Sequence, residues 1–320
     1  MATFPSVTSY TPIVTLNQPI SQLAQGNDNR IWGATDGTVF AIGGSVATFS
    51  GGPSAPGCGA SYDGSADVWF TPFSTPSLYK VTTAGVITSS TPSGNAYGLS
   101  SVLGPDGRIW KVTTNDNHVY AILLSGPTQT AYAVNATANG TSGTIVSDGT
   151  NLWVPQYQFT SGSPNVPYVS KVTTAGVVTT YALLTTGGGT YPSGACIGSD
   201  GRLWLAAVAG TLGVWAVTLS TGVSVWYTMP TGTGSAGANT LVLGSDGNVY
   251  APDRSASGVV WQITPSGVWT EYTIAGAQSF SSGALTDNLG NMWLPGIASS
   301  GQAANVYRVS LRTAQIVMIL

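Results

Sequence analysis

A short motif recurs along the whole chain at a nearly constant spacing, and this recurrence constrains the fold more than any other feature. It consists of a glycine, a turn containing Asp and Gly, and an apolar residue followed by an aromatic residue. The copy that ends at Trp293 has lost its Asp. The copies end at Trp32, Trp69, Trp110, Trp153, Trp204, Tyr250 and Trp293. A period of about 43 residues predicts an array of seven supersecondary units.

Each period contains signals for four short strands. A small-residue segment precedes the turn, and the segment after the turn carries the aromatic residue. The third segment alternates and ends in Thr or Ser, as in 214–218, and the fourth is rich in Thr, as in 176–181. Asp-Gly turns join antiparallel strands tightly, and no stretch shows helical periodicity. We therefore predict an all-β fold, a seven-bladed β-propeller with four-stranded antiparallel blades.

The two ends of the chain bear on how the ring closes. Residues 6–10 look like a fourth strand that lies ahead of the first blade, and we expect them to latch the ring by pairing with the last blade. Residues 315–320 are a second candidate for that position, and as an exposed, uncharged edge they would invite aggregation. The alternative is that one end reaches a neighbouring subunit. The expected organisation is one domain, 1–320, with a latch and lead-in at 1–18 and seven repeats at 19–320.

The composition excludes several classes of partner. Charged residues make up 7% of the chain, against about 25% in ordinary proteins. Nine Lys plus Arg and a net charge of −3 argue against nucleic-acid binding. No apolar run approaches the length of a membrane helix, so no membrane insertion is expected. The first residues lack the basic and apolar regions of a signal peptide, so we expect folding in a cytoplasm.

The motifs resemble one known family. Gly-x-Asp-Gly-x-Ile/Leu-Trp followed by x-Val-Thr-x-x-Gly-Val-x-Thr-x-Tyr is similar to the repeat of the streptogramin lyase (virginiamycin B lyase) family, and the similarity covers almost the whole chain. The resemblance implies a seven-bladed propeller. For an active lyase it also implies a histidine base and a magnesium ion held near the channel mouth by His and Glu.

The residues that such a lyase needs are not found together. The chain has one His, His118, and one Glu, Glu271, which are expected on a third strand of blade three and a fourth strand of blade six. The family's Trp-Phe-Thr-Glu run is reduced to Trp-Phe-Thr-Pro at 69–72. A general base must reach its substrate, and magnesium needs clustered oxygen ligands. We therefore predict no catalytic residues, no metal site, no cofactor and no enzymatic activity.

Other repeated residues have structural interpretations. Asp before Gly is a hairpin-turn signal, and the recurring tryptophans are expected to pack between blades. Cys58 and Cys196 fall on inner strands of blades two and five, too far apart for a disulfide, so two free thiols are expected. The aspartates concerned are Asp106, Asp148, Asp200 and Asp246.

Candidate binding residues lie where the repeat is interrupted, because loops on a rigid scaffold commonly carry binding. The irregular loops, expected on one face of the ring, are 51–62, 70–77, 154–167, 185–195 and 252–258. Trp226 and Trp269 depart from the repeat and are expected on outer strands. The other candidates are the loop residues Phe73, Tyr157, Phe159, Tyr191, Asp253 and Arg254.

The composition also points to a biological setting. A surface so poor in charge, with few Lys residues to protect strand edges, suits a part packed into an assembly. This resembles bacteriophage virion proteins, and the leading hypothesis is a tail-associated, fibre or capsid-decorating propeller located in the virion. Its partners would be other virion proteins or further copies of itself, and a host-surface glycan or protein. The alternatives are a streptogramin lyase-like enzyme and a cell-surface carbohydrate- or protein-binding module.

Overall fold

The structure is a computed structural model, and the statements below concern the residues that it describes. These are 2–12, 20–35, 37–53, 58–73, 75–92, 98–113, 117–126, 128–134, 140–141, 143–158, 166–185, 191–208, 210–230, 237–238, 240–254, 258–297 and 304–311.

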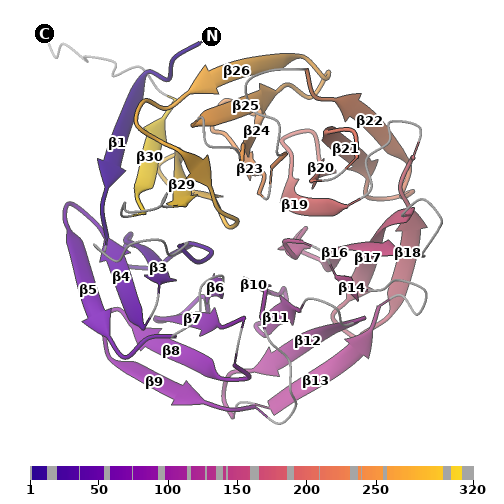
Figure 1. The fold of residues 1–320 in the computed structure, drawn as a ribbon. Coiled ribbons are helices and arrows are strands. Elements are labelled where there is room, and N and C mark those ends of the chain that lie inside the picture. Colours follow the sequence, from indigo (N-terminus) through magenta and orange to yellow (C-terminus); the bar gives the residue numbers. More distant parts are fainter. Residues whose placement is uncertain are drawn as a thin grey trace, which may run out of the picture.

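Seven antiparallel sheets stand around a central axis (Figure 1), so the predicted seven-bladed propeller is confirmed. The strands of each blade follow one another from the axis outward. Blade 1 consists of β2 (Ala24–Gln25), β3 (Ile31–Thr35), β4 (Thr38–Ile42) and β5 (Val46–Ser50). Blade 2 consists of β6 (Gly59–Tyr62), β7 (Asp67–Thr71), β8 (Leu78–Thr82) and β9 (Ile87–Ser90). Blade 3 consists of β10 (Ser100–Leu103), β11 (Ile109–Val112), β12 (His118–Leu123) and β13 (Thr128–Ala133).

The remaining blades repeat this order, with the inner strand divided in two in blades 4 and 7. Blade 4 consists of β14 (Gly140–Thr141), β15 (Val146–Ser147), β16 (Asn151–Gln158), β17 (Val166–Thr173) and β18 (Val178–Ala182). Blade 5 consists of β19 (Pro192–Ile197), β20 (Arg202–Ala207), β21 (Gly213–Thr218) and β22 (Ser224–Thr228). Blade 6 consists of β23 (Val242–Leu243), β24 (Val249–Pro252), β25 (Val259–Ile263) and β26 (Trp269–Thr273). Blade 7 consists of β27 (Ser279–Phe280), β28 (Leu285–Thr286), β29 (Asn291–Ile297), β30 (Val306–Ser310) and β1 (Ser6–Tyr10).

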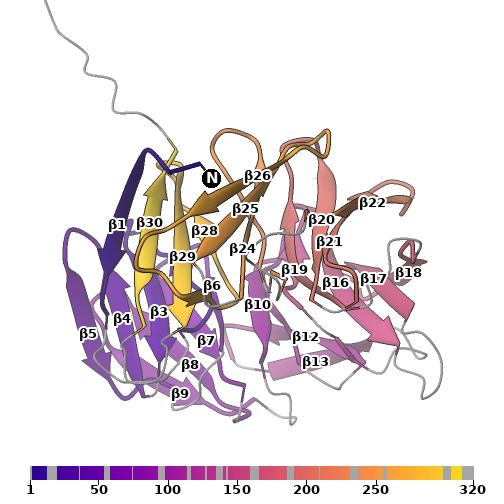
Figure 2. The ribbon, with the colours of Figure 1, turned by 45° about the horizontal axis from the view of Figure 1, so that its top comes forward.

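Strand β1 closes the ring as the outermost strand of blade 7 (Figure 2). It pairs antiparallel with β30, from Ser6 opposite Ser310 to Tyr10 opposite Val306. The ring of Tyr10 stacks on Trp293 of the same blade at 5.5 Å. The predicted latch by residues 6–10 is therefore confirmed, whereas residues 315–320 lie outside the described part of the chain.

The residues ahead of β1 also hold blade 6. The amide of Ala2 donates to the carbonyl oxygen of Glu271 at 2.9 Å, and Phe4 stacks on Tyr272 with 4.4 Å between ring centroids. In blades 1, 3, 4 and 5 an equivalent aromatic ring on the outer strand is covered by the turn between the third and fourth strands of the next blade. Blade 7 has no such turn, because its third and fourth strands come from opposite ends of the chain. Phe4 takes the place of that turn and closes the joint between blades 6 and 7.

The turn that normally covers the ring contains a glycine with positive φ. At Gly222 φ is 73°, and a Cβ atom there would lie 1.9 Å from Cδ1 of Tyr181 in the preceding blade. Only glycine therefore permits both the turn and the close approach of the aromatic ring. The same packing recurs at Gly85 on Phe49, Gly176 on Tyr132 and Gly267 on Tyr227.

The core lies between blades, as the recurrence of the tryptophans predicts. Trp32, Trp110, Trp153 and Trp204 are fully buried. Blades 5 and 6 share one apolar cluster that contains both Trp204 and Trp261. Each interface therefore depends on both of the blades that form it.

An aspartate binds the aromatic residue of the motif in every blade. Its carboxylate also accepts backbone N–H groups of its own turn, as Asp106 does from Arg108, so the predicted turn role is confirmed. The prediction that the seventh copy lacks an Asp is wrong, because Asp287 accepts from Nε1 of Trp293 at 2.8 Å. The bonds to aromatic residues are Asp28–Trp32 (3.3 Å), Asp63–Trp69 (3.1 Å), Asp106–Trp110 (3.0 Å), Asp148–Trp153 (2.8 Å), Asp200–Trp204 (3.2 Å), Asp246–Tyr250 (2.8 Å) and Asp287–Trp293.

Three arginines extend these contacts to the next blade. Arg108 donates to Asp106, lies over the ring of Trp110 at 4.8 Å and donates to the carbonyl oxygen of Thr174 in blade 4. Equivalent bonds join Arg30 to Thr83 and Arg202 to Pro265. Turns between the first and second strands thus lie beside turns between the third and fourth strands, on what we call the hairpin face. The opposite face, with the remaining connections, is the loop face.

Candidate functional site

The central channel is an apolar cavity of about 480 Å³. Side chains from six blades line it, and none of the described lining residues is charged or aromatic. Two of its three threonines are engaged within the wall: Thr240 Oγ1 accepts the amide of Ala284, and Thr286 Oγ1 donates to the carbonyl oxygen of Leu243. The described lining therefore offers a ligand no carboxylate, imidazole, ammonium or guanidinium group.

Gln22 ties the inner strands of the first three blades together. Its Nε2 donates to the carbonyl oxygen of Ser101, and its Oε1 accepts from the amides of Ser101 and Ala60. Its own amide donates to the carbonyl oxygen of Cys58. Because these bonds engage both ends of the amide side chain, Gln22 serves the ring and is not available to a substrate.

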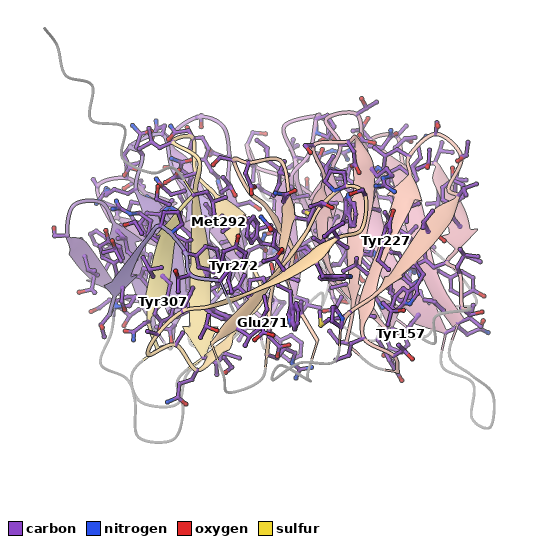
Figure 3. The ribbon with its side chains drawn as sticks, turned by 90° about the horizontal axis from the view of Figure 1, so that it is seen from above. Tyr157, Tyr227, Glu271, Tyr272, Met292 and Tyr307 are labelled. Atoms are coloured by element: carbon purple, nitrogen blue, oxygen red, sulfur yellow. The ribbon has the colours of Figure 1, made fainter. Side chains whose placement is uncertain are left out.

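The loop face brings together two of the predicted binding residues, Tyr157 and Tyr191. Their rings lie 4.6 Å apart and are tilted by 55°. The segment predicted as a loop at 154–167 is in part a long hairpin, since β16 continues to Gln158 and β17 begins at Val166. This hairpin carries Tyr157 at the lower face of the ring in Figure 3. On the same hairpin, Tyr168 donates from its hydroxyl to Oε1 of Gln158 at 3.2 Å.

The other predicted loop residues do not join this pair into one site. Phe73 is 41% exposed in the connection between β7 and β8, whereas Phe159 lies outside the described residues. Asp253 and Arg254, the two adjacent charged residues among the loop candidates, differ in exposure. Arg254 is exposed, but Asp253 is 1% exposed because it lies at the end of β24 under the connections of blades 6 and 7.

Trp226 and Trp269 lie on the outer strands β22 and β26, as predicted, but each packs against its own blade. Trp226 lies 4.7 Å from Trp215, and its Nε1 donates to Thr228 Oγ1. Trp269 meets Trp261 edge to face at 6.2 Å. Both are half-buried, so each offers one edge of its ring to a partner.

The two residues considered for lyase chemistry lie in separate blades. His118 begins β12 of blade 3, and Glu271 lies on the outer strand β26 of blade 6, across the ring in Figure 1. Among the described residues, no three His, Cys, Asp or Glu side chains lie close enough to hold a metal ion.

A buried lysine was missed by the sequence analysis. Lys111 follows the aromatic residue of blade 3 and is 2% exposed. Burial lowers the pKa of its ammonium group to about 8. The signal was present in the repeat, since the same position holds Val154, Leu205 and Leu294 in other blades and is buried there.

The two cysteines are free, as predicted. Burial raises the pKa of the Cys58 thiol to about 12, and it also raises the pKa of the Cys196 thiol. Because the thiolate is the reactive form, both thiols are expected to be inert in the folded protein.

An apolar rim was also missed. A valine follows the turn glycine in four blades and is exposed in each, which places four valines at equivalent points on the outer edge of the hairpin face. The exposed fractions are 59% for Val86, 63% for Val177, 63% for Val223 and 60% for Val268. The sequence signal is the repeated Gly-Val pair. The predicted turn accounts for the glycine of this pair but not for the exposed position of the valine.

A groove of about 490 Å³ lies on the outer wall between blades 4 and 5. Thr180, Tyr181 and Leu184 line it from blade 4, and Val223 lines it from blade 5. The amide of Leu184 donates to Ser224 Oγ at 3.0 Å, which joins the two blades along the groove.

The comparisons with known proteins support the fold. No protein-family model and no curated sequence matches the chain. A streptogramin B lyase structure is similar with a TM-score of 0.73 and 17% identity, over 95% of this chain and 98% of that one. A catalytically inactive virginiamycin B lyase from Staphylococcus aureus, solved with quinupristin, has a TM-score of 0.73 and 18% identity, over 95% of this chain and 99% of that one. Hydrazine synthase of Kuenenia stuttgartiensis has a TM-score of 0.72 and 12% identity, over 94% of this chain and 99% of that one.

The TM-scores establish a shared architecture. At these low identities they establish nothing about activity, because one fold carries many functions. No helix of the described residues is long and apolar enough to cross a bilayer. The chain is a seven-bladed β-propeller that is structurally similar to virginiamycin B lyase at low sequence identity.

Proposed function

We propose that this chain is a non-enzymatic propeller that acts by packing against other proteins, and that it is a component of a bacteriophage virion. In that setting it is tail-associated, part of a fibre or bound to the capsid. Its partners are other virion proteins or further copies of itself.

The observation that carries the proposal is the rim formed by Val86, Val177, Val223 and Val268. Complete burial of one valine side chain is worth about 1.5 kcal/mol or more. Repeated exposure at equivalent points is therefore costly unless a partner covers it. The composition adds support, because with 7% charged residues there are few charges to keep copies or partners apart.

Mass spectrometry of purified phage particles tests the virion assignment directly. We expect the chain in the particles at a defined ratio to the capsid protein. Its absence from particles would overturn the assignment. Magnesium-dependent turnover of quinupristin by the purified chain would overturn the non-enzymatic part and revive the lyase alternative.

A second candidate function, recognition of a host-surface glycan, is favoured by the Tyr157–Tyr191 pair. The two tilted tyrosine rings offer apolar faces together with polar tips, a combination common in recognition surfaces. A glycan array with the wild-type chain, the double variant Tyr157→Ala/Tyr191→Ala and the control Phe73→Ala tests it. Phe73 lies on the same face, and its loss is expected to leave binding unchanged. Equal loss in both variants, or no binding by the wild type, would remove this candidate.

A further inference from the structure

We infer that residues 312–320 of one copy add as an extra strand to the outer edge of β18 in a second copy, along the groove between blades 4 and 5. The inference rests on the proposed function, since it names a second copy of this chain as a packing partner.

The groove has the features of a strand acceptor. Among the strands that the structure describes, β18 is the last of its sheet, so no further described strand lies beside the outer side of its backbone. Such an edge is a template for pairing with another chain. Beside this edge, Tyr181, Leu184 and Val223 supply apolar surface, and no lining residue is charged. Leu184 is 45% exposed and Val223 is 63% exposed.

The chain already uses this kind of docking at its other end. The segment before β1 runs beside β26, which is the outer strand of blade 6. Ala2 forms a parallel bridge with Tyr272 and donates its amide to the carbonyl oxygen of Glu271. Phe4 is 8% exposed because it packs on Tyr272, which lies in β26. Tyr181 lies correspondingly in β18, where the Gly222 turn of blade 5 already packs on its ring, so only the backbone edge of β18 is comparable with that of β26. An uncharged extended segment therefore binds an outer strand within this molecule.

The sequence of residues 312–320 suits the role of donor. After Arg312 the segment has no charged residue, no Pro and no Gly, and it contains Ile316, Val317, Met318, Ile319 and Leu320. Alternate side chains of a strand point to the same side, so one set would face the groove. Segments of this kind are among the most prone to pair as strands.

The geometry of the ring requires a second copy. The segment follows β30 in blade 7, and β18 lies on the other side of the ring, beyond blades 5 and 6 (Figure 1). Nine residues reach at most about 31 Å when fully extended. The donor and acceptor surfaces differ, so the contact is heterologous and each copy can add another. We expect a chain-like assembly that grows with concentration.

Two full-length variants separate the donor from the acceptor. Ile316→Lys/Met318→Lys places charges in the donor segment, and Val223→Lys places a charge in the groove. Val268→Lys is the matched control, because Val268 occupies the equivalent position of blade 6 and is equally exposed. Light scattering at two concentrations measures the mass of each protein and of mixtures.

The wild type and Val268→Lys are expected to gain mass with concentration, and each of the other two variants is expected to stay at 32.6 kDa. A mixture of the donor variant and the groove variant retains one intact donor and one intact groove. It should therefore form a dimer of about twice that mass and nothing larger. A wild type that stays monomeric, a donor variant that still assembles or a mixture that does not pair would overturn the inference. Equal loss in Val268→Lys would place the contact on the rim instead. Particle composition tests the proposed function separately.

Discussion

At the scale of single residues, the aspartate of the motif has more partners than a turn requires. The carboxylate of Asp106 accepts from the backbone of Arg108, from the Arg108 side chain and from Trp110. Although partial burial works to raise it, these hydrogen bonds lower the pKa of Asp106 below its ordinary value. The group therefore contributes stability above about pH 4, and this contribution is lost as pH falls through the lowered pKa.

Asp287 provides the sharpest test of this role, since its motif does not show an Asp at the usual spacing. Asp287→Ala removes the acceptor for Trp293, for two backbone amides and for Asn291. We expect a loss of about 1–3 kcal/mol in the free energy of unfolding, measured by urea titration. Leu289→Ala, in the same turn and 69% exposed, should change it by less than about 0.5 kcal/mol. Equal effects of the two substitutions would show that the hydrogen bonds contribute nothing.

Lys111 predicts a pH dependence of the same direction, but in the alkaline range. Its pKa is about 8 in the folded protein and about 10.4 in an unfolded chain. Between these values the unfolded state binds more protons, so this lysine makes stability rise with pH by up to about 3 kcal/mol. Lys111→Met removes this rise of stability with pH. The free energy of unfolding of the variant should therefore exceed that of the wild type most strongly below pH 8. Urea titrations of both proteins from pH 7 to 10.5 measure the difference between their free energies of unfolding. The contributions of the other titrating groups are the same in both proteins and cancel in this difference. Parallel curves for the two proteins would refute the lowered pKa.

At the scale of elements, the periodicity of the sequence predicts the blades because each strand repeats the same pattern. It does not predict the exceptions. Tyr157 and Gln158 continue a strand rather than a loop, because pairing with Val166 and Pro167 makes this hairpin longer than the equivalent hairpins in the described parts of the other blades. Asp253 is buried by connections from two blades, a tertiary effect that no local pattern carries.

The latch is the element whose prediction from sequence was most specific, and its energetics can be tested. Phe4→Ala removes a ring that is 8% exposed against Tyr272, so we expect a loss of about 3 kcal/mol in the free energy of unfolding. Val7→Ala, in β1 itself but 40% exposed, should cost under about 1 kcal/mol. Urea titration compares the two. If Phe4→Ala costs no more than Val7→Ala, the segment before β1 does not help to close the ring.

At the scale of the whole molecule, the two faces and the wall of the ring offer different surfaces. The hairpin face has an apolar rim, the loop face has the Tyr157–Tyr191 pair, and the wall has the groove beside β18. The predicted binding residues lie in irregular loops and, for Trp226 and Trp269, on outer strands, because these are the places where the sequence departs from the repeat. The rim arises from the repeat itself, and its exposure follows from the turn geometry that precedes each valine.

Because the ring is closed, its blades are expected to unfold together as a single unit. An open repeat array can lose end units one at a time, because each unit contacts only its neighbours. In this ring every blade has two apolar interfaces, and the last interface is closed by β1 and Phe4. Opening any one interface therefore exposes surface on two blades and removes the constraint on the rest. We expect the single predicted domain to unfold in one transition.

Cys58 and Cys196 can show whether distant blades unfold in the same transition, because they lie at the inner strands of blades 2 and 5. Burial keeps both thiols protonated in the folded protein. Brief labelling with iodoacetamide across a urea series, read out for each cysteine by mass spectrometry, should give the same midpoint at both sites. In Phe4→Ala both midpoints should move together to lower urea, although Phe4 packs between blades 6 and 7, far along the chain from either cysteine. Separate midpoints, or a shift at only one cysteine, would mean that the blades unfold as independent groups and that the latch stabilises only its own joint.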